Sequence, residues 1–344
     1  MTERPISWDE IFEKLTEKQN LSDLQINWAM SQILDGLANN DQIKNFLLLL
    51  KAKGEKPSEV RALVDVMYQR GIAINIAERA VDIVGTGGDG ASTINISTTA
   101  AIITTAAGAR TIKHGNRAAS SKSGAADLLE ALGIDISLGA EQIQECVRRI
   151  GIGFAFAPVF HPAMKNAASA RRELATPTVF NILGPLANPA KPKAVAIGVA
   201  RAELLELVAT VLAERGCEGF IFRGDDGLDE ISLSTTSTIF QINNGEITRH
   251  IFDPSELGLE RVGIEELRGG TPSENADITR AIFAGKGGAY RQAVLLNAAA
   301  AIAAFKADFH LGLTQQLANG YTLAKQAVDS GAAAQLVERW ANLS

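Results

Sequence analysis

The first 70 residues carry apolar side chains at helical spacing. From position 22 to 34 they recur every three or four residues, as on one face of an amphipathic helix. Short polar residues that cap helix starts and glycines that end helices divide this part into segments. The starts are Ser7, Ser22 (with Gln25 completing a capping box), Asp41 and Ser58, and the stops are Gly36, Gly54 and Gly71. The pattern predicts four consecutive helices and no strand.

From about residue 80 the pattern changes to short apolar runs that alternate with helical ones. We expect strands at 82–84, 110–113, 134–137 and 153–157, and helices at 97–107, 125–132 and 140–150. Such alternation is typical of a mainly parallel sheet with helices on its faces. In these sheets ligands bind at the carboxyl ends of the strands.

The next segment is marked by proline. Six of the ten prolines lie between residues 158 and 192. We expect a helix over 161–174 and then a rigid, proline-rich crossover, of the kind that joins or hinges domains. Further along, the α/β pattern resumes with strands at 194–199 and 219–223, a helix at 202–215, a hairpin around Asn243-Asn244-Gly245 and alanine-rich helices over 273–342.

These patterns together predict the α/β class with two domains. A small N-terminal helical domain covers 1–74, and segment 161–192 packs on it. A larger α/β domain with a mainly parallel central sheet covers 75–344, linked to the first by the proline-rich hinge.

Composition narrows the classes of function. The net charge is 33 − 39 = −6, which argues against a general nucleic-acid-binding protein. Two cysteines without a CxxC spacing indicate neither a disulfide framework nor a zinc site. The N-terminus lacks a signal-peptide pattern, and the apolar runs are too short or too interrupted to span a bilayer. We therefore expect a soluble, cytoplasmic protein with no membrane partner.

The first candidate loop is Gly85-Thr86-Gly87-Gly88-Asp89-Gly90, between a predicted strand and a helix that starts in Asn95-Ile96-Ser97-Thr98. Glycines and helix N-termini let backbone N–H groups approach an anion. The loop also matches G-x-G-x-x-G, but the acid that a dinucleotide fold needs about 20 residues later is missing. It lacks the Gly-Lys-Ser/Thr ending of a P-loop as well. The composition predicts a phosphate site rather than an NAD site.

The second candidate loop is Lys113-His114-Gly115-Asn116-Arg117, followed by Ser120-Ser121-Lys122-Ser123-Gly124. No acidic residue lies between Asp89 and Asp127. Lysine offers a point charge to a phosphate and arginine a bidentate fork. His114 fits either a structural hydrogen bond or acid–base chemistry, and the sequence leaves both open. The two loops together predict a multiply phosphorylated ligand.

An acidic loop follows a later strand, as Gly224-Asp225-Asp226-Gly227-Leu228-Asp229-Glu230. Neighbouring carboxylates repel each other unless a cation lies between them. Magnesium is commonly held by one or two carboxylates plus substrate phosphates. A solvated acidic loop is the alternative interpretation.

In order and spacing these motifs resemble those of the anthranilate phosphoribosyltransferase family. The resemblance rests on GTGGDG, NIST, KHGNR with SSKSG, FNILGPLANP and GLDE, and it covers nearly the whole chain. It implies transfer of the phosphoribosyl group of phosphoribosyl diphosphate to anthranilate, with Mg²⁺ as cofactor. It also implies a homodimer formed through the helical domain.

The resemblance also assigns roles to individual positions. Donor contacts are expected at Gly85, Gly88, Asp89, Thr93, Asn95, Ile96, Ser97, Thr98, Lys113, His114, Gly115, Asn116, Arg117, Ser120, Ser121 and Ala125. Anthranilate contacts are expected at Gly85, Asn116 and Arg171, with Arg172 as the other choice of register. Metal contacts are expected at Ser97, Asp229 and Glu230, with Asp225 or Asp226 as further candidates.

Two alternatives remain at this stage. A pyrimidine nucleoside phosphorylase would share the fold but use phosphate to cleave a nucleoside. A non-catalytic paralogue would bind nucleic acid through a basic groove, which the net acidity opposes. No residue pattern indicates a nucleophilic Ser or Cys, so the expected chemistry is stabilisation of a departing diphosphate.

Overall fold

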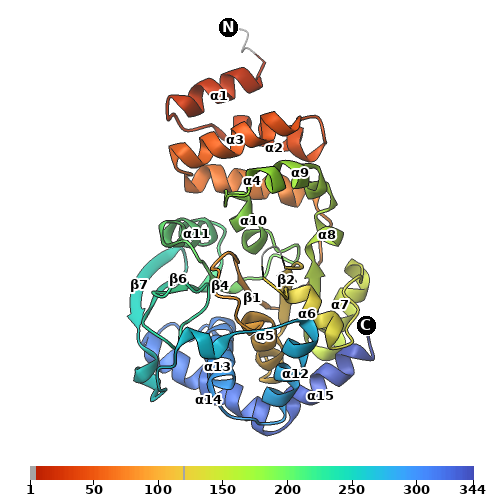
Figure 1. Ribbon diagram of the computed structural model, residues 1–344, viewed down its shortest axis with the longest axis vertical. Helices are drawn as coiled ribbons and strands as arrows, with labels where there is room; N and C mark the ends of the chain where they lie inside the picture. Colours follow the sequence, from red (N-terminus) through yellow and green to blue (C-terminus); the bar gives the residue numbers. More distant parts are fainter. Residues whose placement is uncertain (1–4, 119–120) are drawn as a thin grey trace.

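The computed structural model describes residues 5–118 and 121–344. Figure 1 shows a bundle of helices above a larger α/β body. The helices of the bundle are α1 (Trp8–Thr16), α2 (Asp23–Leu34), α3 (Asn40–Lys53) and α4 (Pro57–Arg70). The α/β body begins with β1 (Val81–Gly85), α5 (Ile96–Ala106), β2 (Thr111–Gly115), α6 (Ala125–Ala131), α7 (Ala140–Ile150) and β3 (Ile152–Phe156).

The chain then crosses back to the bundle before it completes the sheet. The crossover holds α8 (Ala157–Phe160), η1 (Pro162–Ala167), α9 (Ala168–Leu174) and α10 (Phe180–Leu186). The remaining elements are β4 (Ala194–Gly198), α11 (Ala202–Glu214), β5 (Glu218–Gly224), β6 (Ser237–Asn243), β7 (Glu246–Phe252), η2 (Pro254–Leu257), η3 (Ile264–Leu267), α12 (Pro272–Phe283), α13 (Ala289–Lys306), α14 (Leu313–Asp329) and α15 (Ala332–Ala341).

The sheet has the strand order β3-β2-β1-β4-β5-β6-β7. The strands from β3 to β5 are parallel, whereas β6 and β7 add an antiparallel hairpin. The turn of that hairpin uses Asn244 and Gly245, both at positive φ, as the sequence signal predicts. Strand order reverses between β1 and β4, and such a switch point is where open α/β sheets bind ligands. The predicted mainly parallel sheet is confirmed.

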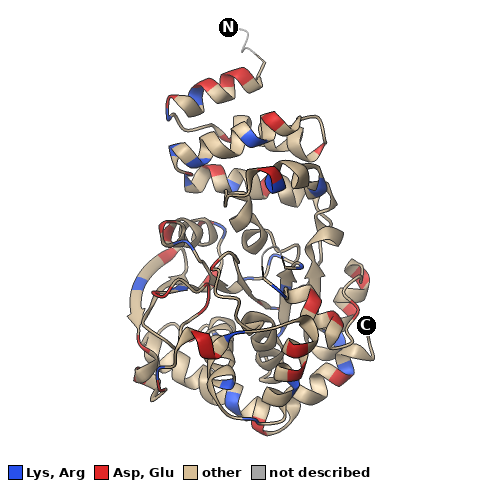
Figure 2. Cartoon of the chain, in the orientation of Figure 1, with Lys and Arg blue, Asp and Glu red and all other residues tan. Residues whose placement is uncertain are grey.

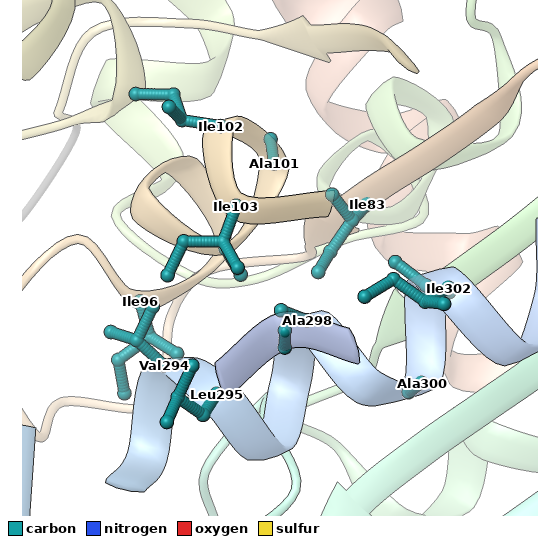
Figure 3. Close-up of a cluster of buried hydrophobic side chains, with 14 of the residues drawn as sticks. Ile83, Ile96, Ala101, Ile102, Ile103, Val294, Leu295, Ala298, Ala300 and Ile302 are labelled. Carbon is teal, nitrogen blue, oxygen red and sulfur yellow. The ribbon is translucent and has the colours of Figure 1, made fainter. Parts of the chain in front are cut away.

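One face of the sheet is covered by α5, α13 and the C-terminal helices. Figure 3 shows Ile102 and Ile103 of α5, Ile83 of β1 and Ile302 of α13 in this buried cluster. The alanine-rich sequence of α13 is explained by its burial, because small side chains let α5 and the sheet approach its backbone closely. This packing fixes the start of α5, where one predicted phosphate loop ends.

The other face packs against α10 and α11, and through them against the helical bundle. Val195 and Ile197 of β4 share one apolar core with Phe46 and Leu63 of the bundle. The crossover lies directly on the bundle, since the Asn166 side chain donates to Leu34 O at 2.8 Å and Asn40 donates to Glu173 at 2.8 Å. Segment 161–192 therefore joins the two parts through a continuous core.

Two sequence predictions about elements are wrong. Residues 134–137 form no strand: Ile134 and Ile136 are buried, but the backbone between them lies outside the sheet. Their alternation reflects apolar contacts of an extended segment, which a strand would also show. The predicted helix over 161–174 is divided, because Pro162 begins a short 3-10 helix before α9.

Helix starts follow the predicted chemistry in two of the four places. The Ser7 side chain caps α1, and Ser22 forms a full capping box with Gln25. At α3 the cap is Asn39 rather than Asp41, and α4 starts at Pro57, one residue before Ser58. These shifts of one or two residues are the usual uncertainty of helix boundaries.

Candidate active site

The acidic loop after β5 lies over the carboxyl ends of β1 and β4. Asp229 Oδ2 accepts a hydrogen bond from Gly87 N at 2.6 Å. A Cβ added to Gly85 would come within 2.1 Å of Asp229 Oδ2, and one added to Gly198 within 1.7 Å of Asp229 O. Both strands therefore end in glycine where the acidic loop closes on them. The switch point brings together Gly87 and Asp229, which are 142 residues apart in sequence.

Asp229 and Glu230 are buried carboxylates. Burial, and then the nearby Asp89 carboxylate, raise the pKa of Asp229 to about 7. Burial and the Asp229 charge raise the pKa of Glu230 well above its usual range. Glu230 Oε1 accepts from the backbone N of Ser97, at the start of α5, at 3.2 Å. The acidic loop is thus tied to both the glycine loop and α5.

Lys113 supplies the cation of this cluster. Its ammonium donates to Ile83 O at 2.5 Å and to Ser97 Oγ at 3.3 Å. Burial lowers the pKa of Lys113, and the acids Asp82, Glu230 and Asp229 oppose that shift. The buried carboxylates outnumber this one buried cation, so the arrangement favours a further positive charge.

The donor chemistry fits a magnesium ion. Asp229, Glu230 and the Ser97 hydroxyl are all oxygen donors, which hard cations prefer. In the described ranges, no group of three or more His, Cys, Asp or Glu side chains is arranged to hold a metal alone. This agrees with the usual magnesium site, in which one or two carboxylates act together with substrate phosphates and waters.

Asn95 connects the two candidate phosphate loops. Its Nδ2 donates to Ser123 O at 2.9 Å, and its Oδ1 accepts from Ser123 Oγ at 2.9 Å and from Asn275 Nδ2 at 2.8 Å. Thr93 pairs with Arg268 in an isolated bridge beside this contact. The Asn95 side chain is therefore already engaged between loops, and its role is to bring the starts of α5 and α6 together.

His114 is a structural hydrogen-bonder in this arrangement. Its Nδ1 donates to Gly184 O at 2.8 Å, and its Nε2 is buried with no partner among the described residues. Burial, with His161 and Lys113 adding to the effect, lowers its pKa to about 3. His161 makes the matching contact with Ala187 O at 2.8 Å. His114 thus holds α10 against β2, and His161 joins the start of the crossover to the residue after α10.

Sequence reasoning missed two buried supports under the second loop. Asp82 Oδ1 accepts from the backbone N of His114 at 3.2 Å, and its Oδ2 accepts from Asn188 Nδ2 at 2.8 Å. Asn188 Nδ2 also donates to Ile112 O at 2.8 Å. The detectable signal was an acid inside the apolar run Val81–Val84, which a buried strand tolerates only with partners.

Several predicted contacts lie at the edge of this cluster. Arg117 turns toward α6, where it pairs with Asp127 at 2.9 Å and Glu130 at 2.5 Å. Asn116 is exposed, and its Oδ1 accepts from Arg117 N. Ser121 Oγ donates to Ser123 O at 3.3 Å, whereas Ser120 lies outside the described residues.

Four other predicted positions fall on the walls around the loops. They are the left-handed Gly88, the buried Ile96 and Thr98 at the start of α5, and Ala125 opening α6. The Ala125 Cβ would come within 3.1 Å of a Cβ on Gly115, so a side chain at Gly115 would crowd the second loop.

Two sets of predicted residues lie away from the carboxylate pair. Arg171 and Arg172 are exposed on α9, which packs against the bundle helix α3. Asp225 accepts from Thr236 Oγ1 at 2.5 Å and Asp226 from Ser232 Oγ at 2.5 Å, so both face the hydroxyls beyond the loop. Of the four acids in the loop, only Asp229 and Glu230 are buried beside Lys113.

Comparison with known proteins agrees with this geometry. The family described as glycosyl transferase family, a/b domain, matches residues 77–334, and its helical bundle domain matches residues 9–71. An anthranilate phosphoribosyltransferase of Rhodococcus jostii is 50% identical over 338 residues, which cover 98% of this chain and 93% of the relative. The chain belongs to the anthranilate phosphoribosyltransferase family.

Solved structures of the family superpose over nearly the whole chain. The Thermus thermophilus anthranilate phosphoribosyltransferase has a TM-score of 0.90 at 37% identity, covering 97% of this chain and 98% of that one. The Saccharomyces cerevisiae enzyme in complex with PRPP and Mg has a TM-score of 0.88 at 28% identity, covering 98% and 97%. The same yeast enzyme has also been solved with 4-fluoroanthranilate, at a TM-score of 0.87 and 26% identity.

Membership confirms the glycosyltransferase class and the predicted main reaction. Neither the nucleoside phosphorylase nor the nucleic-acid-binding paralogue is favoured by these relatives. In the described part of the chain, no helix is both long and apolar enough to cross a membrane.

Proposed function

We propose that the protein transfers the phosphoribosyl group of 5-phosphoribosyl 1-diphosphate to the amine of anthranilate, releasing diphosphate. The observation that carries this is the buried carboxylate pair, Asp229 and Glu230, next to Lys113 and two glycine-bearing loops at the sheet's switch point. Family membership and the PRPP and Mg complex of the yeast relative support it.

Donor binding is assigned to the two loops. The N–H groups around Gly88 and the positive dipole end of α5 would attract a phosphorylated ligand. The Lys113 ammonium adds a charge close to Ser97 Oγ. Asp229, Glu230 and Ser97 would hold Mg²⁺, whose charge stabilises the departing diphosphate when bound.

Leaving-group stabilisation is the central task of the proposed reaction. As the anomeric C–O bond breaks, negative charge grows on the diphosphate and positive charge on the ribose. The Lys113 ammonium is fixed by Ile83 O and therefore needs no reorganisation to meet that charge. The aromatic amine is already a nucleophile and mainly requires positioning.

Acceptor binding is assigned to Gly85, Asn116 and Arg171. The Asn116 amide can both donate and accept, and a guanidinium matches a carboxylate in bidentate geometry. No ion pair or hydrogen bond engages the Arg171 side chain within the described ranges. It is thus available for an anthranilate carboxylate, and Arg172 is the alternative position.

Three further assignments complete the proposal. The domain division at 74/75 fits family matches that end at 71 and begin at 77. A homodimer through the helical bundle fits the exposed Leu24 and Leu37 on that bundle. A cytoplasmic location fits an enzyme family of amino-acid biosynthesis.

The proposal includes no nucleic-acid partner. In the view of Figure 2, positive and negative residues are mixed along the bundle, and the side in view is not mainly basic.

The deciding experiment follows the fluorescence of anthranilate in the presence of phosphoribosyl diphosphate and magnesium. Consumption of anthranilate with release of diphosphate is expected, and it should stop when a chelator removes the metal. Phosphorolysis of thymidine or uridine without anthranilate consumption would replace this proposal by the phosphorylase.

A further inference from the structure

A cavity lies beside the C-terminal end of α10, where Pro185 and Leu186 line it. Its volume is about 360 Å³, within the usual size range of small-ligand sites. The walls are Tyr68, Asp82, Pro185, Leu186, Asn188, Lys191, Pro192, Lys193, Val195, Leu212, Arg215, Gly216 and Cys217. Val195 stands in the first half of β4 and Asp82 in the first half of β1, so the cavity lies toward the amino ends of these strands.

Two cations meet an aromatic ring at this cavity. The Lys191 ammonium lies 4.5 Å and the Arg215 guanidinium 4.9 Å from the centroid of the Tyr68 ring. The Tyr68 hydroxyl is fixed by donation to Leu186 O at 3.1 Å. The position of the Tyr68 ring is therefore fixed, and the positive charges of Lys191 and Arg215 lie beside it.

Three cations line the cavity, Lys191, Lys193 and Arg215, and they differ in how their charges are balanced. Arg215 pairs with Asp65 of the bundle at 2.8 Å, and Lys193 pairs with Glu218 at 2.8 Å. Lys191 has no carboxylate within 4 Å in residues 5–118 and 121–344. Lys191 also has φ +48°, a left-handed conformation that few residues other than glycine adopt. The Lys191 ammonium therefore lies beside the Tyr68 ring without a carboxylate partner among the described residues.

Several of the other lining residues are apolar. Leu186, Val195 and Leu212, together with two prolines, face the cavity. Asp82 is the acid in the lining, and both of its oxygens already accept hydrogen bonds from His114 N and Asn188 Nδ2. A ligand that combines a negatively charged group with an apolar part would match these lining residues.

We propose that this cavity is a second ligand site, which binds a small organic carboxylate through Lys191 and Arg215 and covers its apolar body with Val195 and Leu212. Tyr68 and Asp65 belong to the helical bundle, whereas the other groups belong to the α/β body. A bound carboxylate therefore links the two parts and favours the arrangement in which both walls contact it.

The test uses hexanoate as the probe and hexanol as its uncharged counterpart. Methyl NMR of the full-length protein reports on the cavity through Leu186, Val195 and Leu212. Hexanoate is expected to shift these three signals saturably, whereas hexanol should bind at least about tenfold more weakly, because it lacks the charge. Absence of saturable shifts, or equal binding of the two probes, would overturn the proposal.

Variants locate the site. Lys191→Gln should weaken hexanoate at least about tenfold and leave hexanol unchanged. The matched control Lys325→Gln, on α14, should leave both unchanged. Arg171→Ala should not alter hexanoate binding, and a loss there would mean that the probe occupies the acceptor site. Thermal unfolding of each variant separates lost binding from lost folding, and a folded Lys191→Gln protein with unaltered hexanoate affinity would reject the site.

Discussion

At the scale of single residues, the candidate active site depends on glycines that make room for a carboxylate. Gly85 ends β1 where Asp229 closes over it, and Gly198 plays the same part for β4. Neither glycine has a positive φ, so the requirement is space rather than backbone freedom. Asp229 is in turn held by Gly87 N. Small changes here should act on the position of the carboxylates proposed to bind the metal.

Gly85→Ala should therefore lower the rate of phosphoribosyl transfer by about 100-fold, because the added methyl displaces Asp229 from its position. Steady-state kinetics at saturating magnesium measure the effect. Gly312→Ala is the control, since a Cβ there has no neighbour within 4 Å. Equal rates for both variants would show that Asp229 tolerates displacement.

Replacing both carboxylates, as Asp229→Asn with Glu230→Gln, should lower magnesium-dependent turnover by at least about 100-fold. The Tm should not fall, because the variant removes two buried carboxylate charges whose pKa values burial raises above the usual range. Turnover and thermal unfolding are measured on the same preparation. Turnover close to that of the unmodified protein would remove the metal assignment.

At the scale of elements, the crossover is fixed to the sheet rather than loosely hinged. His114 and His161 hold Gly184 O and Ala187 O of the α10 segment, and Asn188 bonds to β1 and β2 together. The prolines restrict the same segment from within. Any closure of the bundle over the site therefore has to bend elsewhere or break these buried contacts.

His114 should make stability depend on pH. Its folded pKa of about 3 lies below the ordinary value of 6.5, so its contribution is complete above pH 6.5 and is lost as the pH falls toward 3. At pH 5 the loss is about 2 kcal/mol. In His114→Asn, the difference in unfolding free energy between pH 8 and pH 5 should shrink by that amount. The exposed His310→Asn is the control, and an unchanged difference in His114→Asn would contradict the assignment.

Asn188→Ala should lower the free energy of unfolding by about 2 to 4 kcal/mol, because it leaves Asp82 and Ile112 O buried without their donor. Urea unfolding measures the change. Asn181→Ala removes one partly buried contact, in which the exposed Asn181 side chain accepts from Thr178 N, and should cost less than about 1 kcal/mol. Similar losses of unfolding free energy in the two variants would show that the Asn188 contacts contribute no more to stability than the Asn181 contact.

At the scale of the whole molecule, the helical bundle carries the most exposed large apolar side chains. Leu24 is 70% and Leu37 67% exposed, and Leu48 is 41% exposed. Ile251, at 54%, lies apart from them on the outer strand β7. Apolar side chains gathered on one part of a surface mark interaction sites.

The double variant Leu24→Asp with Leu37→Asp should convert the proposed dimer into a monomer, because each charge would have to be buried in the interface. Light scattering after size exclusion gives the mass. Ile251→Asp should leave the mass unchanged. A dimer that survives the double variant would place the interface elsewhere.

The sequence by itself determined the order and type of most elements. Local rules decide these features: the 3.6-residue period of α2, the capping box at Ser22, and the Asn244-Gly245 turn all act within a few residues. It also indicated the two candidate phosphate loops and Asp229-Glu230. Glycine-rich loops and clustered carboxylates lower the stability of a fold unless another group interacts with them.

Only the tertiary structure decided which of these groups meet. Asp229 reaches Gly87 because β1 and β4 are neighbours across the switch point, a pairing that no local pattern shows. The same packing directs Arg117 to Glu130, occupies His114 with Gly184 O and hides Asp82 under the second loop. The physical reason is that the packing of whole helices and strands decides which side chains far apart in sequence come into contact. The type of a residue shows only which interactions its side chain can make.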